Sequence, residues 1–147
     1  MEYTQGKLGR VFVARLHDGE SIYDEVHNIC IREGIRYAFI QAMGGIRGAT
    51  NTTGEGRELV GLGTVIPDQN KPVLHFHAGI GKEKDAFIGN PRDRIKVHML
   101  MEVVITEIMG IDAIRAFDKD LDCNILTIVG KGTDYSEKDT QMKGSLN

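Results

Sequence analysis

The stretch Pro72-Val73-Leu74-His75-Phe76-His77-Ala78-Gly79 has the alternating pattern of a β-strand. Successive side chains of a strand point to opposite faces, so His75 and His77 share one face. The apolar side chains Leu74, Phe76 and Ala78 take the other face. The stretch therefore predicts a strand with a histidine pair on one side and an apolar surface on the other.

Histidines at i and i+2 of a strand have their Cα atoms about 6.5–7 Å apart. This spacing lets two imidazoles converge on one metal ion, with about 2.0–2.1 Å between each nitrogen and the ion. The same pattern also suits a pair of surface or interface histidines, or two hydrogen-bonded histidines in a core. The spacing by itself leaves these interpretations open.

One helix is expected, at about residues 20–33. Ile22, Val26, Ile29 and Cys30 recur at helical spacing. Ser21 is suited to cap the start of the helix and Gly34 to end it. His27 lies beside this apolar stripe, as a polar residue on the flank of the helix.

The rest of the chain favours strands. Those expected are 7–16, 35–43, 48–53, 57–66, 73–80, 95–109 and 124–129, with a short one at 86–88. Residues 112–117 suit either a helical turn or a strand, and Met99, Met101 and Met109 are most simply core residues. Many strands with one helix indicate an α+β fold, with a mainly antiparallel β-sheet in a single domain. We expect the domain at residues 1–130 and a polar, flexible tail at 131–147.

Composition limits the classes of function. The chain has 147 residues, of which 41% are hydrophobic and 27% charged, with a net charge of −3. This balance lacks the basic surface of a nucleic-acid-binding protein, and we do not expect direct nucleic-acid binding. Cys30 and Cys123 lie far apart and indicate no disulfide framework, which favours the cytoplasm. We expect no signal peptide, and the apolar run at 97–111 is interrupted by charges and is not a membrane span.

The chemistry-bearing residues that remain are histidines and carboxylates. No Gly-x-Ser-x-Gly or Gly-x-Gly-x-x-Gly motif occurs. A zinc site with an open position uses about three protein ligands. His75 and His77 supply two, and His98, on the next long strand, is the third candidate if that strand pairs with the first. Glu102 shares the strand face of His98 and could orient an imidazole or carry a proton, although a solvated or salt-bridged carboxylate is the commoner role.

Four short motifs resemble the plants and prokaryotes conserved (PPC) domain. In order along the chain they are Gly9-Arg10-Val11-Phe12, Gly56-Arg57-Glu58-Leu59 with Leu62-Gly63, Leu74-His75-Phe76-His77-Ala78, and Glu102-Val103-Val104-Ile105-Thr106-Glu107. The resemblance covers about residues 7–130. It implies an α+β fold around an antiparallel sheet, and a homotrimer. The His-x-His pair is also similar to that of acetolactate decarboxylases, whose related fold holds zinc with three histidines.

The chain departs from this family pattern at one important position. Where relatives carry Gly-Gly-His after the His-x-His strand, this chain has Gly89-Asn90. An asparagine is a poor zinc ligand, which leaves the third ligand open, with His98 and a group from a neighbouring subunit as the candidates. The AT-hook core Arg-Gly-Arg-Pro, which accompanies the domain in plants, does not occur.

Two classes of function follow. The first is a trimeric metal-binding protein with His75, His77 and His98 around zinc or another divalent transition metal. Such a site could decarboxylate or hydrolyse a small molecule, and Glu102 is the candidate catalytic residue. The second is a non-enzymatic oligomerisation or regulatory module, DNA-associated in relatives. The sequence does not decide whether the protein is an enzyme.

Overall fold

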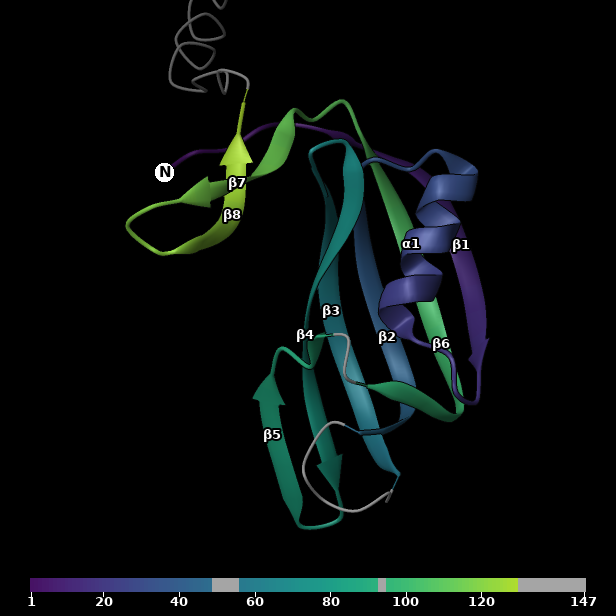
Figure 1. Ribbon diagram of the computed structural model, residues 1–147. Coiled ribbons are helices and arrows are strands. Elements are labelled where there is room, and N and C mark those ends of the chain that lie inside the picture. Colours follow the sequence, from purple (N-terminus) through teal and green to yellow (C-terminus); the bar gives the residue numbers. More distant parts are fainter. Residues whose placement is uncertain (49–55, 93–94, 130–147) are drawn as a thin grey trace, which may run out of the picture.

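The protein folds as one six-stranded antiparallel sheet with a helix on one face and a two-stranded hairpin at one end (Figure 1). The computed structural model describes residues 1–48, 56–92 and 95–129. Strand order across the sheet is β1-β6-β2-β3-β4-β5, and β7 pairs with β8. The elements are β1 (Lys7–His17), α1 (Ile22–Glu33), β2 (Ala38–Arg47), β3 (Arg57–Asp68), β4 (Lys71–Lys82), β5 (Asp85–Gly89), β6 (Lys96–Met109), β7 (Ala113–Asp118) and β8 (Cys123–Ile128).

The expected fold class is confirmed: the sheet is antiparallel throughout and the described residues hold a single α-helix. Residues 86–88 fall within β5, and of the segment 112–117 all but Asp112 lie in strand β7. Most of the strand expected at 48–53 lies outside the described residues, as does the expected tail at 131–147. No helix in the described ranges is long and apolar enough to cross a membrane.

Helix α1 ends at the predicted residue and begins two residues after the expected position 20, directly behind its predicted cap Ser21. The Ser21 side chain accepts a hydrogen bond from the backbone N of Asp24, and Gly34 ends the helix with φ of 67°. Glycine adopts this left-handed conformation without the steric cost that a side chain brings. The helix buries Ile22, Val26 and Cys30 against the sheet.

The main core lies between α1 and the sheet, and Phe76 of β4 is its largest fully buried side chain. The Phe76 ring meets the ring of Tyr23 edge to face, with 6.5 Å between centroids. Gly61 and Gly63 of β3 lie against the same ring, where a Cβ atom would collide with it. The strand face predicted to be apolar is therefore the core face.

The opposite face of the sheet, which we call the open face, carries His75 and His77. At one end the β7–β8 hairpin covers it, through a small cluster that includes Tyr37, Ile66 and Ala113. Elsewhere it exposes apolar side chains, notably Val13, Val60 and Leu62. The open face thus combines the histidine pair with an uncovered apolar surface.

Strand β6 contains a bulge that the sequence pattern does not reveal. Its pairing with β2 shifts between Val97 and Met101. Met99 adopts φ of 66° and donates its backbone N–H to the Asp18 carboxylate at 2.9 Å. Of the three methionines expected in the core, only Met101 is buried; Met99 and Met109 are 73% and 44% exposed. The prediction for those two was wrong, because the bulge turns Met99 outward and Met109 ends the strand.

An ion pair ties β1 to β6 and α1. Arg10 Nε donates to Glu107 Oε2 at 2.8 Å and Arg10 Nη2 to Oε1 at 3.0 Å. The same Nη2 donates to the Glu33 carbonyl at the end of α1. These hydrogen bonds from Arg10 hold the pKa of the nearly buried Glu107 carboxyl below its usual range.

We expect Gly61→Ala to destabilise the fold by about 1–3 kcal/mol, the usual cost of overpacking a core. The added methyl group would collide with the Phe76 ring and approach Ala78 Cβ at 2.9 Å. Gly89→Ala is the matched control, because an added Cβ there has no neighbour within 4 Å. Urea unfolding measures both, and equal midpoints for the two variants would contradict the role given to Gly61.

We expect the stabilising contribution of Glu107 to depend on pH. A lowered folded-state pKa means that the contribution is full above the ordinary glutamate pKa and is lost as the pH falls through the folded value. Melting temperatures of the wild type and of Glu107→Gln should therefore differ most at pH 7 and converge at acid pH. Glu2→Gln, at an exposed position, serves as control. A difference that is independent of pH would contradict the assignment.

Candidate metal site

The candidate site centres on two imidazoles that converge on the open face. His75 and His77 lie on β4, and their Nε2 atoms are hydrogen-bonded to each other at 3.1 Å, with one ring donating and the other accepting. The rings are nearly perpendicular, with 4.9 Å between their centroids. Alternation along the strand places both side chains on the same face, and burial of Phe76 between them fixes which face it is.

This arrangement fits two ligands of one transition-metal ion. Two ligands at about 2.0–2.1 Å from a tetrahedral ion are about 3.3–3.4 Å from each other. The observed Nε2 separation of 3.1 Å is close to that value. Neutral imidazole nitrogens are also the donors that zinc, copper, nickel and iron accept. The donor pair therefore suits a metal in both spacing and chemistry.

The environment of His75 favours its neutral form. Partial burial lowers the pKa of His75, and the charges of Arg115 and His77 lower it further. Since only a neutral imidazole has a lone pair to give a metal, the shift favours the ligand form.

Arg115 reaches this site from β7. Its Nη2 donates to Thr64 Oγ1 at 3.3 Å, and Thr64 lies directly opposite His75 in the β3–β4 pairing. Directly opposed residues have Cβ atoms about 4.5–5.5 Å apart, so the guanidinium is bonded to the nearest cross-strand neighbour of His75. Burial lowers the pKa of Arg115, which nevertheless stays charged at neutral pH.

The structure does not bring His98 to this pair. The expected pairing of its strand with the His75 strand was wrong, because β6 lies between β1 and β2, three strand spacings of about 4.8 Å from β4. The residues paired across the sheet from His77 lead to Val104 on β6. His98 is six residues from Val104, so it lies roughly 15–20 Å further away along the strand. His98 instead lies near the bulge, with Nδ1 3.8 Å from the Asp18 carboxylate.

Glu102 and Asn90 do not complete the pair either. Glu102 is exposed on the open face of β6, opposite Arg15 of β1 and Met43 of β2. The Asn90 side-chain oxygen accepts hydrogen bonds from the Tyr23 hydroxyl and the Arg92 backbone N. Across residues 1–48, 56–92 and 95–129, no three His, Cys, Asp or Glu side chains are grouped to hold an ion.

Sequence reasoning missed Arg115 and Thr64. No motif surrounds Arg115, and residues 112–117 suited a helical turn as well as a strand. Its place beside His75 arises from the packing of the β7–β8 hairpin on β3, which joins positions about fifty residues apart. The only hint in the sequence was that residues 112–117 could form a strand, which would allow Arg115 to pack beside the sheet.

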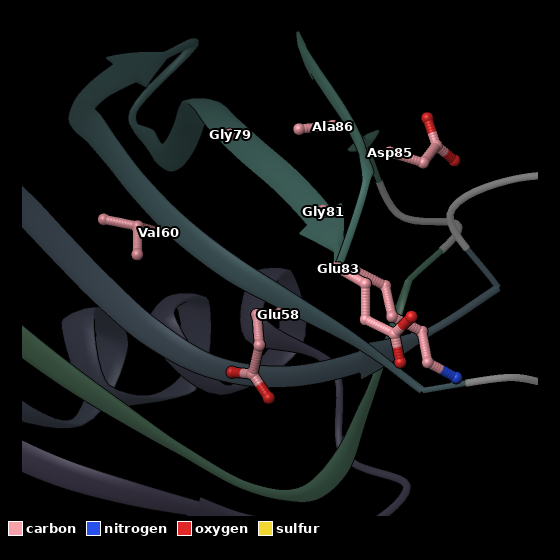
Figure 2. A pocket seen from close by; sticks show the side chains of 8 residues that line it. Glu58, Val60, Gly79, Gly81, Glu83, Asp85 and Ala86 are labelled. Atoms are coloured by element: carbon pink, nitrogen blue, oxygen red, sulfur yellow. The ribbon is translucent and has the colours of Figure 1, made fainter.

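A hollow lies elsewhere on the open face, between β3, β4 and β5 (Figure 2). It has a volume of about 340 Å³ and is lined by Glu58, Val60, Gly79, Gly81, Lys82, Glu83, Asp85 and Ala86. Figure 2 shows the carboxylates spread along the rim without converging. The Asp85 carboxylate already accepts from Arg57 Nη2 at 2.8 Å, so this hollow is a weaker candidate than the histidine pair.

Known proteins share the sequence pattern and the fold of this chain. The sequence model of the Plants and Prokaryotes Conserved (PCC) domain matches residues 3–109. A plant- and prokaryote-conserved (PPC) protein of Pyrococcus horikoshii has a similar structure, with a TM-score of 0.75 and 21% identity over 88% of this chain and 99% of that one. Among curated proteins, none matches the chain.

Two further solved structures share the fold. A metal-containing protein of Archaeoglobus fulgidus gives a TM-score of 0.74, with 21% identity over 86% of this chain and 99% of that one. A protein of Bacteroides thetaiotaomicron, named as a candidate DNA-binding protein, gives 0.68, with 18% identity over 84% and 97% of the two chains. At such identities the likeness concerns the fold.

Proposed function

The chain belongs to the Plants and Prokaryotes Conserved (PCC) domain family, and from the histidine geometry we propose that it binds a divalent transition metal, zinc in the first place, through His75 and His77. The observation that carries the proposal is the 3.1 Å separation of their Nε2 atoms on an exposed face. The similarity to a metal-containing archaeal protein of the same fold supports it.

The chain supplies two ligands for the proposed ion, which leaves further positions to water or a bound molecule. A zinc ion held in this way would act as a Lewis acid or lower the pKa of a bound water. Decarboxylation or hydrolysis of a small molecule is the chemistry that we propose for such a site. His98 can become a ligand of this ion only if it comes from another copy of the chain. Glu102 can likewise act as a catalytic residue at this site only from another copy.

We expect purified protein to bind about one zinc ion per chain, and His75→Ala or His77→Ala to abolish this. Loss of one of two direct ligands should weaken binding by more than the roughly 10–100-fold that loss of an outer-shell partner costs. Equilibrium dialysis with elemental analysis measures the stoichiometry on protein without a histidine tag.

His27→Ala is the matched control for zinc binding. His27 lies on α1 and its Nδ1 is 3.0 Å from the Pro72 carbonyl, away from the pair. We expect His98→Ala to retain zinc as well, because its strand is distant. Loss of zinc in His98→Ala would mean that a second copy contributes this ligand. Zinc content unchanged in His75→Ala would overturn the proposal.

A non-enzymatic assembly role is the second candidate, and the open face is the observation that favours it. Val60 is 66% exposed there and Val13 is 78% exposed. Exposed apolar surface of this kind marks interaction sites in soluble proteins. We propose that a homotrimer forms with part of this face buried, without direct nucleic-acid binding, and that the protein works in the cytoplasm, where the free thiols of Cys30 and Cys123 stay reduced.

We expect light scattering to give three times the 16.3 kDa mass of the chain. Val60→Glu should lower that mass, because burying an unpaired carboxylate in an interface is costly. Ile31→Glu on α1 is the matched control, since Ile31 is 59% exposed on the other side of the molecule. A monomeric wild type would contradict the trimer.

A further inference from the structure

We propose that Arg115 binds the carboxylate group of a small-molecule ligand at the His75–His77 site. The ligand carboxylate would give one oxygen to the metal and accept a hydrogen bond from the Arg115 guanidinium through the other. This inference rests on the proposed metal function and names the class of ligand that the site takes.

The first ground is position. Arg115 lies on β7, and its Nη2 hydrogen bond to Thr64 Oγ1 holds the guanidinium over β3. Thr64 is the register partner of His75. The hydrogen bond therefore holds the guanidinium at the residue that faces His75 across the β3–β4 pairing.

The second ground is an unused hydrogen-bond donor. Arg115 Nε is buried and donates to no atom of the described residues. Buried polar groups are nearly always satisfied, and a native exception calls for an explanation. A guanidinium has five N–H donors arranged to match a carboxylate, and one hydroxyl partner leaves most of that capacity unused.

The third ground is charge. No carboxylate of the described residues forms an ion pair with Arg115. A divalent ion on two neutral imidazoles would add two positive charges beside this one. Unlike a site with an aspartate or glutamate ligand, this pair offers no compensating negative charge. An anionic ligand would offset this excess of positive charge. One of its oxygens would occupy a coordination position of the metal that the chain does not fill.

A carboxylate meets both requirements in one group. Carboxylate oxygens bind zinc at about 2.0–2.2 Å, and planar carboxylates match the guanidinium fork. The two oxygens point in different directions from one carbon, so one group can contact both the metal and Arg115. An inorganic oxyanion such as phosphate is the competing ligand that the experiment must distinguish.

The test uses the full chain loaded with Co²⁺, whose absorption spectrum responds to changes in its ligands. Co²⁺ binding is first measured for the wild type, Arg115→Gln and Arg115→Lys. Acetate and inorganic phosphate are then titrated separately into each. We expect Arg115→Gln to keep Co²⁺ and to lose at least about tenfold in acetate affinity, with Arg115→Lys in between. Arg32→Gln, on the exposed side of α1, is the matched control and should behave as the wild type.

The outcomes separate this inference from the function on which it rests. If the wild type and Arg115→Gln both bind Co²⁺ and have equal affinity for acetate, the role of Arg115 is overturned and the metal site stands. Failure of the wild type to bind Co²⁺ overturns the metal function and the inference with it. Phosphate binding that exceeds acetate binding and depends on Arg115 overturns the carboxylate class. If Arg115→Gln unfolds, the Arg115→Lys titration decides, since that variant keeps the charge.

Discussion

Burial of Phe76 is the constraint on which the rest of the structure depends. The ring fills the space that Gly61 and Gly63 leave on β3 and meets Tyr23 of α1. Side chains alternate along β4, so this contact fixes the register of the strand and directs His75 and His77 to the open face. A slip of one residue would bury both imidazoles and expose the ring. The core therefore determines where the candidate chemistry lies.

Features that depend on neighbouring residues could be predicted from the sequence. The strand character of 72–79, the shared face of its histidines and the two ends of α1 follow from alternation, helical spacing and capping, and the structure has all of them. Strand order is different, because it depends on contacts between distant segments. The interval from His77 to His98 is compatible with an adjacent strand, yet β6 pairs instead with β1 and β2.

The bulge in β6 illustrates the same limit. Its sequence predicts one continuous strand over 95–109, and the exposed position of Met99 is fixed by a contact from outside the strand. The Asp18 carboxylate, eighty-one residues away, accepts from the Met99 backbone N and from Arg47. These hydrogen bonds hold the Asp18 pKa below its usual value and fix the conformation from which His98 projects. A pattern within one strand carries no information about such a partner.

The histidine pair and the exposed apolar side chains occupy one face, so the two proposed properties are physically linked. Leu62 lies directly opposite His77 and is 54% exposed, which places apolar surface next to the imidazoles. A second copy packed on this surface would exclude water from the neighbourhood of the site. Electrostatic interactions strengthen as the local dielectric constant falls, so contact between Arg115 and an anion would be stronger in such an assembly than in a single chain. Ligand binding that favours the assembled form must, by mass action, also favour assembly. Metal, ligand and oligomeric state therefore have to be measured together at this site.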